Sequence, residues 1–396
     1  MSEKSTPRTD LMTRARRIVI KLGTATLTRD DGAIALSRFY SFVESIAALR
    51  AQGRQVLVVS SGAVGLGAER LRFKRSQSPL PVKQALAAVG QGRLMALYSD
   101  AFDRLGLTCA QVLLTEGDFS DRRRYLNLSQ TITTLLDLGA IPVINENDTV
   151  STSELEPSDS EGHRRINFGD NDKLSALIAS RMEADLLLIL TDVDGLHAGD
   201  PNGPDKPELI PQVAEITEDL ALMAGGASSG RGGMRTKLEA ARIATLSGCA
   251  TVIANGRAPA VIDDVTAGRD VGTLFLPRPG LSGKRRWIAF AKSVNGAVIV
   301  NDGACKAILH RKASLLPAGV TGVRGEFARG DVVSILDESG REVARALTNF
   351  SSAETIAVSG LRTHEFPPSG NDARYDTVAT RDHIVVLARA QDDESL

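Results

Sequence analysis

The chain has 396 residues, of which 42% are hydrophobic and 4% aromatic, enough to fill one large core and a second, smaller one. Its 47 lysine and arginine residues nearly balance 48 aspartate and glutamate residues, so the net charge is −1 and the pI is near 6.6. This balance excludes a global field that draws the chain to nucleic acid or to a membrane. Any anion must therefore be bound by a local site.

The cysteines and the N-terminal segment indicate the compartment. Cys109, Cys249 and Cys305 lie far apart without the spacing of a zinc or redox pair, which predicts buried core residues in a reducing compartment. No apolar run is long enough to span a membrane, and the polar segment 1–16 resembles neither a signal peptide nor a transit peptide. We expect a soluble, cytoplasmic protein whose residues 1–16 form a disordered tail.

Strand and helix patterns alternate through the first two thirds of the chain. Apolar residues at helical spacing predict helices over 36–53, 83–106 and 123–139. Continuous apolar runs rich in β-branched residues predict buried strands over 17–23, 54–62, 107–115, 140–147, 185–195 and 249–256. The alternation predicts an α/β fold, a three-layer sandwich in which helices cover both faces of a mainly parallel sheet.

The pattern changes after about residue 283 to short strands and tight turns. The stretch GDVVSILDESGREVARAL, residues 330–347, predicts a hairpin around Asp-Glu-Ser-Gly. We therefore expect a large domain over 17–280 and a small all-β domain over 281–396, joined near PRPGLSGK.

In a parallel α/β sheet, ligands bind in the crevice beyond the carboxyl ends of the strands. The predicted strands end in a strongly polar set of residues: Lys21 to Gly23, Ser60 to Gly62, Asn145 to Asp148, Thr191 to Asp194, and Asn255 to Gly256. The sequence allows two positions for the side chain of Lys21. It either meets a ligand beside Gly23, or extends along an edge strand to reach solvent.

A glycine-rich loop precedes a predicted helix at ASSGRGGMRTKLEAARIA, residues 227–244, with Lys237 in the first turns of that helix. Free amides at a helix N-terminus together with an ammonium group suit a phosphate chain, whereas the alternative is a linker with a glycine cap. The stretch does not match the Walker pattern, and no G-x-G-x-x-G follows a strand.

Two clusters of amides and carboxylates, Asn145 to Asp148 and Asp170 to Asp172, could each simply cap a helix or form a turn. Together they describe an amino-acid site, in which Asp148 accepts from an ammonium group while asparagine side chains and Ser61 donate to carboxylate oxygens. Motifs of zinc hydrolases, serine hydrolases and protein kinases are missing, and Asp192 to Gly195 is too short for a calcium loop.

The ordered motifs VIKLGTATLT, VVSSGAVGLG, PVINENDTV, FGDNDKLSALIA, LLLILTDVDGL and GRGGMRTKLEAA resemble the amino acid kinase family, in particular its glutamate-phosphorylating members. The segment KQALAAVGQGRLM and the tail with SLLPAGV, GEFARGDVV and SSAE resemble them too, and the tail is similar to their PUA domain. The resemblance runs from about residue 17 to 390.

The resemblance implies transfer of a phosphoryl group from ATP, with Mg²⁺, to the side-chain carboxylate of L-glutamate, the first step of proline biosynthesis. It implies catalytic roles for Lys21, Lys237, Asp170 and Asp172, the two aspartates orienting the lysines or helping to hold magnesium. Glutamate would be bound by Ser61, Asn147, Asp148 and Asn171. Besides Lys21, the nucleotide would be bound by Thr191, Asp192, Arg231, Gly232, Gly233, Met234, Arg235, Thr236 and Lys237.

Three features depart from the family pattern. Arg231 stands where the family usually carries a threonine, so the side-chain part of that phosphate contact is in question. The long charged segment 149–169 is hypothesised to affect subunit contacts or feedback inhibition by proline. HEFPPSGNDARY, residues 364–375, is interpreted as a surface insertion.

Competing functions remain. The nearest is phosphorylation of another acid, namely aspartate, N-acetylglutamate or carbamate. RNA binding is an alternative of a different class, because PUA domains elsewhere contact RNA, but residues 295–396 have no long basic run and few aromatics, so nucleic acid is not the expected partner. The resemblance also implies a homo-oligomer, either dimer or tetramer, and makes a partnership with the next enzyme, a reductase, plausible.

Overall fold

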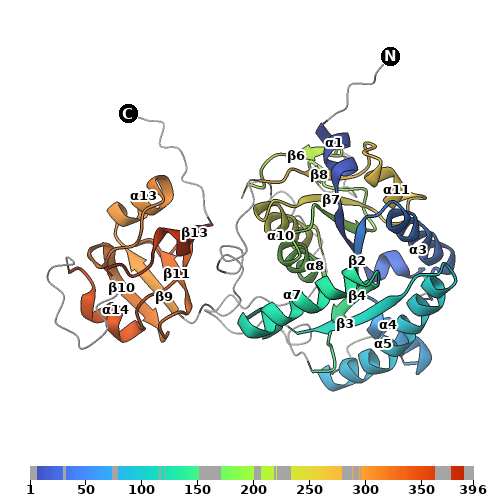
Figure 1. Ribbon diagram of the computed structural model, residues 1–396, viewed down its shortest axis with the longest axis horizontal. Coiled ribbons are helices and arrows are strands. Elements are labelled where there is room, and N and C mark those ends of the chain that lie inside the picture. The colour runs from blue at the N-terminus through green and yellow to red at the C-terminus, as the bar shows by residue number, and fades with distance from the viewer. Residues whose placement is uncertain are drawn as a thin grey trace, which may run out of the picture. The chain divides into compact units, whose positions relative to one another are not determined.

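The structure is a computed structural model that divides into two compact units, Met1–Gly280 and Leu281–Leu396. It describes residues 7–29, 33–73, 79–115, 117–120, 122–150, 171–199, 207–217, 220, 233–278, 288, 294, 296–361 and 376–387. Figure 1 shows the elements of both units along the chain.

The first unit is built on an eight-stranded sheet in the order β3-β4-β2-β1-β5-β7-β8-β6. All neighbours in the sheet run parallel except β7 and β8, which pair antiparallel. The predicted mainly parallel α/β sheet is therefore confirmed. The strands are β1 Arg17–Leu22, β2 Gln55–Ser60, β3 Cys109–Leu114, β4 Ile141–Glu146, β5 Leu186–Thr191, β6 Gln212–Val213, β7 Ala250–Asn255 and β8 Thr273–Phe275.

Helices cover both faces of this sheet. In Figure 1, α8 and α10 lie on one face and α3 and α11 on the other, which makes the three layers that the sequence predicts. The helices are α1 Pro7–Arg14, α2 Thr24–Leu27, α3 Leu36–Ala51, α4 Ala63–Arg70, α5 Leu80–Asp103, α6 Gly117–Ser120, α7 Arg122–Asp137, α8 Asn171–Arg181, α10 Met234–Leu246 and α11 Val261–Thr266.

Helix α1 corrects the prediction of a disordered tail over residues 1–16, which is wrong for Pro7–Arg14. Met12 is fully buried in the main core, and Leu11 packs against that core. Arg8 is also buried and donates from Nη2 to the carbonyl of Val271. The segment is ordered because this short polar helix carries two adjacent apolar side chains that bury surface against the domain.

The order of the strands reverses next to β1. The chain leaves β1 through α3 to reach β2 on one side, and it leaves β5 by way of β6 and α10 to reach β7 on the other side. Since β1 and β5 are neighbours, a crevice is expected beyond their carboxyl ends, where ligands bind in sheets of this kind. Helices α8 and α10 also begin at this edge, because each leads back from the end of one parallel strand towards the start of another.

The second unit contains a five-stranded sheet in the order β10-β9-β11-β12-β13. Its strands are β9 Gly296–Val300, β10 Val320–Gly325, β11 Val332–Leu336, β12 Glu342–Leu347 and β13 Ile384–Val386. The predicted hairpin is confirmed: β11 and β12 pair antiparallel, Asp337 Oδ1 accepts from the amides of Ser339 and Arg341, and Gly340 has the positive φ of +87°.

The second unit also contains helices that the sequence analysis does not predict, α13 Asp302–Arg311 and α14 Ser352–Val358, besides the single turns η1 Pro317–Gly319 and η3 Arg381–His383. Both longer helices carry local start signals. Asn301 Oδ1 accepts from Ala304 N at the start of α13, and Ser351 and Glu354 form a capping box at the start of α14. Across the described parts of both units, no helix is long and apolar enough to span a membrane.

Candidate active site

Two lysines that are far apart in the sequence meet at one buried carboxylate. Lys21 Nζ lies 2.6 Å from Asp172 Oδ1, and Lys237 Nζ lies 3.2 Å from Asp172 Oδ2. The side chains of Lys21, Asp172 and Lys237 are 5%, 0% and 6% exposed. Since each ammonium group is held by a different oxygen of the same carboxylate, Asp172 fixes both cations within reach of a single ligand.

The strand order explains why Lys21 is there. It lies in β1, which pairs with β2 on one side and β5 on the other, so the alternative of an edge-strand lysine that reaches solvent is wrong. At the adjoining turn, a Cβ added to Gly23 would lie 3.3 Å from Lys21 Nζ. A side chain at position 23 would therefore crowd the ammonium group.

The start of α10 adds a hydroxyl to the same cluster. Gly233 is the N-cap residue, in extended conformation, and Thr236 Oγ1 bonds both to its carbonyl at 2.9 Å and to Asp172 Oδ2 at 3.0 Å. Lys237 follows in the first turn of α10. The backbone amides of that turn have no acceptor within the helix. Thr236 therefore ties the start of α10 to the start of α8.

A chain of side-chain amides lies on the other side of Asp172. Asn171 Nδ2 donates to Ser61 Oγ at 2.8 Å, to Ser60 O at 3.2 Å and to Asn145 Oδ1 at 2.9 Å. Asn145 Nδ2 in turn donates to Gln91 Oε1 at 2.9 Å. All of these residues except Ser61 are buried. Asn171 and Ser61, both predicted to bind glutamate, therefore lie in contact, and the Nδ2 group of Asn171 is occupied by protein acceptors.

The first turn of α8 joins the two clusters. Asp172 holds the lysines and Thr236, whereas its neighbour Asn171 belongs to the amide chain. The acidic stretch at the start of this helix therefore does more than begin the helix. It fixes cations on one side and an amide chain on the other.

Helix α5 supports the amide chain, which sequence reasoning missed. Besides Gln91, its Tyr98 is fully buried and donates from its hydroxyl to Ser60 Oγ at 2.9 Å. Burial raises the pKa of Tyr98, so the hydroxyl stays protonated and remains a donor. The signal in the sequence was a polar glutamine within KQALAAVGQGRLM, on a helix that otherwise packs apolar residues into the core.

The remaining predicted residues form local contacts at the same edge. Asn147 accepts from Thr149 Oγ1 through its side chain, and Asp148, next in the chain, is 9% exposed. Thr191 is buried at the end of β5 and donates to Oδ1 of the exposed Asp192 at 3.1 Å. The lysine cluster and the Ser61–Asn171 pair are thus two groups of predicted residues that the structure brings into direct contact.

Several predicted residues lie outside the described part of the chain: Asp170, Arg231 and Gly232. Most of the segment 149–169, which is hypothesised to affect subunit contacts or inhibition by proline, also lies outside the described residues. So do residues 364–375, the predicted surface insertion. Of the glycine-rich loop, the structure describes Gly233, the half-buried Met234 and the exposed Arg235 at the start of α10.

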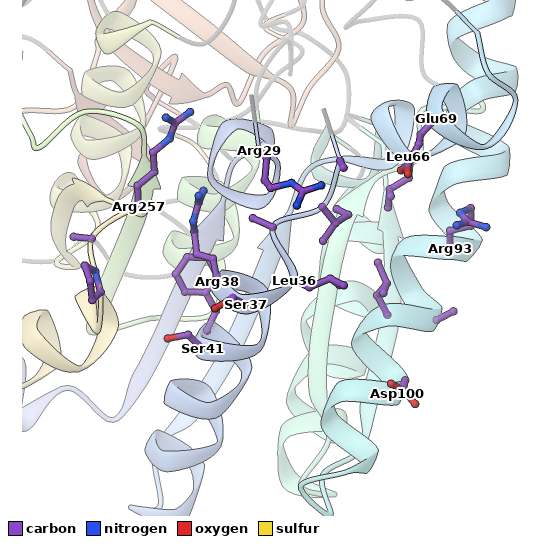
Figure 2. Close-up of a pocket in the computed structure, with 18 residues that line it drawn as sticks. Arg29, Leu36, Ser37, Arg38, Ser41, Leu66, Glu69, Arg93, Asp100 and Arg257 are labelled. Carbon is purple, nitrogen blue, oxygen red and sulfur yellow. The ribbon is translucent and has the colours of Figure 1, made fainter. Parts of the chain in front are cut away.

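A separate groove of about 1080 Å³ lies beside α3, α4 and α5. Figure 2 shows Arg29, Arg38 and Arg257 along one part of it and Glu69 and Arg93 along another. None of the described residues that line it is a predicted site residue. The groove is therefore distinct from the lysine cluster.

Comparison with known protein families assigns the class. The model of the amino acid kinase family matches residues 16–255, and that of the PUA domain matches residues 296–366. The first of these matches spans more than half of the chain and contains both clusters and every strand of the large sheet except β8. The chain therefore belongs to the amino acid kinase family.

Individual relatives show to which group within the amino acid kinase family the chain belongs. The chain is 45% identical over 378 residues to glutamate 5-kinase of Caldanaerobacter subterraneus subsp. tengcongensis, an alignment that covers 95% of this chain and 99% of that protein. It is 44% identical to the glutamate 5-kinase of Moorella thermoacetica, covering 95% and 97%, and 45% identical to that of Acaryochloris marina, covering 94% and 99%. Within the amino acid kinases, the chain is a member of the glutamate 5-kinase family, which confirms the resemblance seen in its motifs.

Proposed function

We propose that the protein transfers the γ-phosphoryl group of ATP to the side-chain carboxylate of L-glutamate, giving γ-glutamyl phosphate, the first step of proline biosynthesis. The observation that carries the proposal is the start of α8, where Asp172 holds two buried lysines and Asn171 belongs to a buried amide chain. A phosphate chain and an amino acid require these two kinds of groups next to each other.

The chemistry requires few groups from the protein. A carboxylate is already a nucleophile near neutral pH, so no general base has to remove a proton. Its oxygen attacks the γ-phosphorus, the bond from that phosphorus to the bridging oxygen of ADP breaks, and ADP leaves with the electron pair. Two anions must approach each other, so alignment and cationic stabilisation of the phosphoryl oxygens lower the barrier.

Lys21 and Lys237 are the groups that stabilise the phosphoryl oxygens in this proposal. Their fixation by a common carboxylate supports the role, because cations that are already oriented need no reorganisation as charge develops. The other proposed nucleotide contacts are Thr191, Asp192 and the stretch from Arg231 to Thr236, of which the amides from Gly233 onward begin α10.

Mg²⁺ is proposed to enter with the nucleotide. Among the residues that the structure describes, no group of three or more histidine, cysteine, aspartate or glutamate side chains could hold a metal ion. Mg²⁺ at phosphate sites usually keeps several waters and uses one or two carboxylates besides phosphate oxygens. When bound, Mg²⁺ supplies charge neutralisation on the phosphate chain. Asp172 is engaged by two lysines, which favours its orienting role.

Glutamate is proposed to bind at Ser61, Asn147, Asp148 and Asn171. Asp148 offers a carboxylate to the free α-amino group of the substrate, and its burial strengthens an interaction with an ammonium group. N-acetylglutamate lacks that ammonium group and would gain nothing from this contact.

The test is to trap the acyl phosphate with hydroxylamine, using glutamate, aspartate, N-acetylglutamate and carbamate in parallel with ATP and Mg²⁺. Hydroxamate should form with glutamate and depend on ATP. If another acid reacts faster than glutamate, the substrate assignment is wrong. If no acid gives hydroxamate and the protein retards structured RNA in a gel at high salt, RNA binding replaces the kinase function.

Membership of the family also supports a homo-oligomer, inhibition by proline and delivery of the labile product to a reductase, in the cytoplasm where ATP and glutamate are available. We propose the same properties for this chain. Light scattering distinguishes a dimer from a tetramer. Shortening the segment 149–169 should change the assembly or the inhibition by proline, and if neither changes, that segment has no such role.

A further inference from the structure

Gln91 ends the amide chain at the side of helix α5. Its Oε1 accepts from Asn145 Nδ2, whose Oδ1 accepts from Asn171 Nδ2. Each side-chain amide has an NH₂ group that donates and an oxygen that accepts. The acceptor at Gln91 therefore determines the orientation of the amides of Asn145 and Asn171. Asn145 must point its donor at Gln91 and its acceptor at Asn171, and Asn171 must then turn its donor towards the protein.

Two polar atoms of this chain have no hydrogen-bond partner among the described residues: Asn171 Oδ1 and Gln91 Nε2. Both belong to residues that are at least nine-tenths buried, where an unsatisfied polar atom is costly. The atom left over at Asn171 is an acceptor, because its Nδ2 already has three acceptors around it. A ligand with donor hydrogens, such as an ammonium group, would satisfy it.

The packing of α5 fixes Gln91 in position. A Cβ added to Gly90 would lie 1.7 Å from the carbonyl oxygen of Ala63, and one added to Gly67 would lie 1.9 Å from that of Leu86. Helices α4 and α5 therefore touch backbone to backbone. Seven residues after Gln91, on the same side of the helix, Tyr98 bonds to Ser60. These contacts hold α5 against the end of β2 and keep Gln91 in place at Asn145, near the end of β4.

We propose that Gln91 is a positioning residue that sets the direction of the amide chain, so that Asn171 presents Oδ1 as an acceptor for the α-amino group of the substrate. Gln91 thereby favours a free amino acid over an acid without the amino group. The inference rests on the proposed function, since it names a specificity determinant for the same substrate site.

Two substitutions separate this role from packing. Gln91→Met keeps the length and removes the acceptor, whereas Gln91→Glu keeps an acceptor oxygen facing Asn145. Gln111→Met, at an exposed position of strand β3, is the matched control for the same chemical change. For each variant the KM for glutamate, the Ki of glutarate, which lacks the amino group, the KM for ATP and the kcat are measured on the full-length chain.

Gln91→Met should raise the KM for glutamate about tenfold or more, the scale of a lost hydrogen bond to a charged group, while the Ki of glutarate and the KM for ATP stay within about threefold. Gln91→Glu and Gln111→Met should keep the preference of the parent for glutamate over glutarate. If Gln91→Met preserves that preference, or weakens glutamate and glutarate equally, the role in specificity is refuted.

If Gln91→Met fails to fold, Gln91→Glu decides, because loss of the preference in a variant that keeps the acceptor contradicts the proposal and its retention supports it. Failure of the proposed function gives a different result. In that case the parent protein itself forms no hydroxamate from glutamate.

Discussion

Lys21 is a buried cation whose position depends on the order of the strands in the large sheet. The sequence indicates a lysine at the end of an apolar strand but leaves open whether that strand lies at the edge of the sheet. Strand order depends on contacts between distant segments, which a local pattern does not contain. In the structure β1 lies between β2 and β5, and Lys21 is paired with Asp172, a residue far from it in the sequence.

Replacing Lys21 by alanine should lower turnover about a hundredfold or more, because a fixed cation next to the transferring phosphoryl group is lost. The hydroxamate assay at saturating ATP and glutamate measures it. Lys306→Ala, at an exposed lysine of the second unit, should leave turnover unchanged. Turnover of Lys21→Ala within about threefold of the parent would remove Lys21 from the catalytic residues.

Asp172→Asn should destabilise the first unit by roughly 3–5 kcal/mol, because both buried lysines lose the carboxylate that holds them. Turnover should fall as well, since the ammonium groups lose their orientation. Denaturant unfolding followed by circular dichroism measures the change, and Asp100→Asn at a solvent-exposed ion pair is the control. If Asp172→Asn unfolds at the same midpoint denaturant concentration as the parent, Asp172 does not anchor the lysines.

At the scale of elements, long periodic segments are predicted well and short ones poorly. The buried strands β1, β2, β4, β5 and β7 are all found, each ending one to four residues before the predicted limit because the polar residues beyond it form turns. Strands β6 and β8 have two and three residues, too few for a pattern. Helix α14 was missed although S-S-A-E carries its capping box.

The contact between α4 and α5 gives a prediction for two glycines of one helix. Gly90→Ala should cost about 1–3 kcal/mol, since its Cβ would meet the Ala63 carbonyl, and it should raise the KM for glutamate by displacing Gln91. Gly92→Ala meets no atom within 4 Å and should stabilise α5 by roughly 0.5–1 kcal/mol. Thermal unfolding compares them, and equal behaviour of both variants would refute the close contact.

The capping box of α14 predicts a dependence on pH. Hydrogen bonds from Arg329, together with those from Ser351, lower the pKa of Glu354 to about 2. Because the folded-state pKa lies below the unfolded value of about 4.3, this stabilisation is present above that value and is lost as pH falls towards 2. Acid unfolding of the second unit should begin at higher pH for Glu354→Gln than for Glu338→Gln, and coincident curves would contradict the role.

At the scale of the whole molecule, the sequence predicts the α/β class and the family because six motifs occur in order, whereas the pairing of side chains within the site could not be predicted. The lysine cluster and the amide chain depend on where α5, α8 and α10 meet the strand ends. That meeting is a property of tertiary packing, which the spacing of residues along the chain does not encode.

The central claim is that the glutamate side chain itself attacks ATP, and an isotope experiment tests it most directly. Glutamate with a heavy oxygen isotope in both side-chain carboxylate positions is incubated with ATP, Mg²⁺, hydroxylamine and the protein. Transfer places one labelled oxygen between carbon and phosphorus, and hydroxylamine then attacks the acyl carbon and expels that oxygen with the phosphate. We predict released phosphate with one heavy oxygen in phosphorus NMR, whereas unlabelled phosphate would contradict the account.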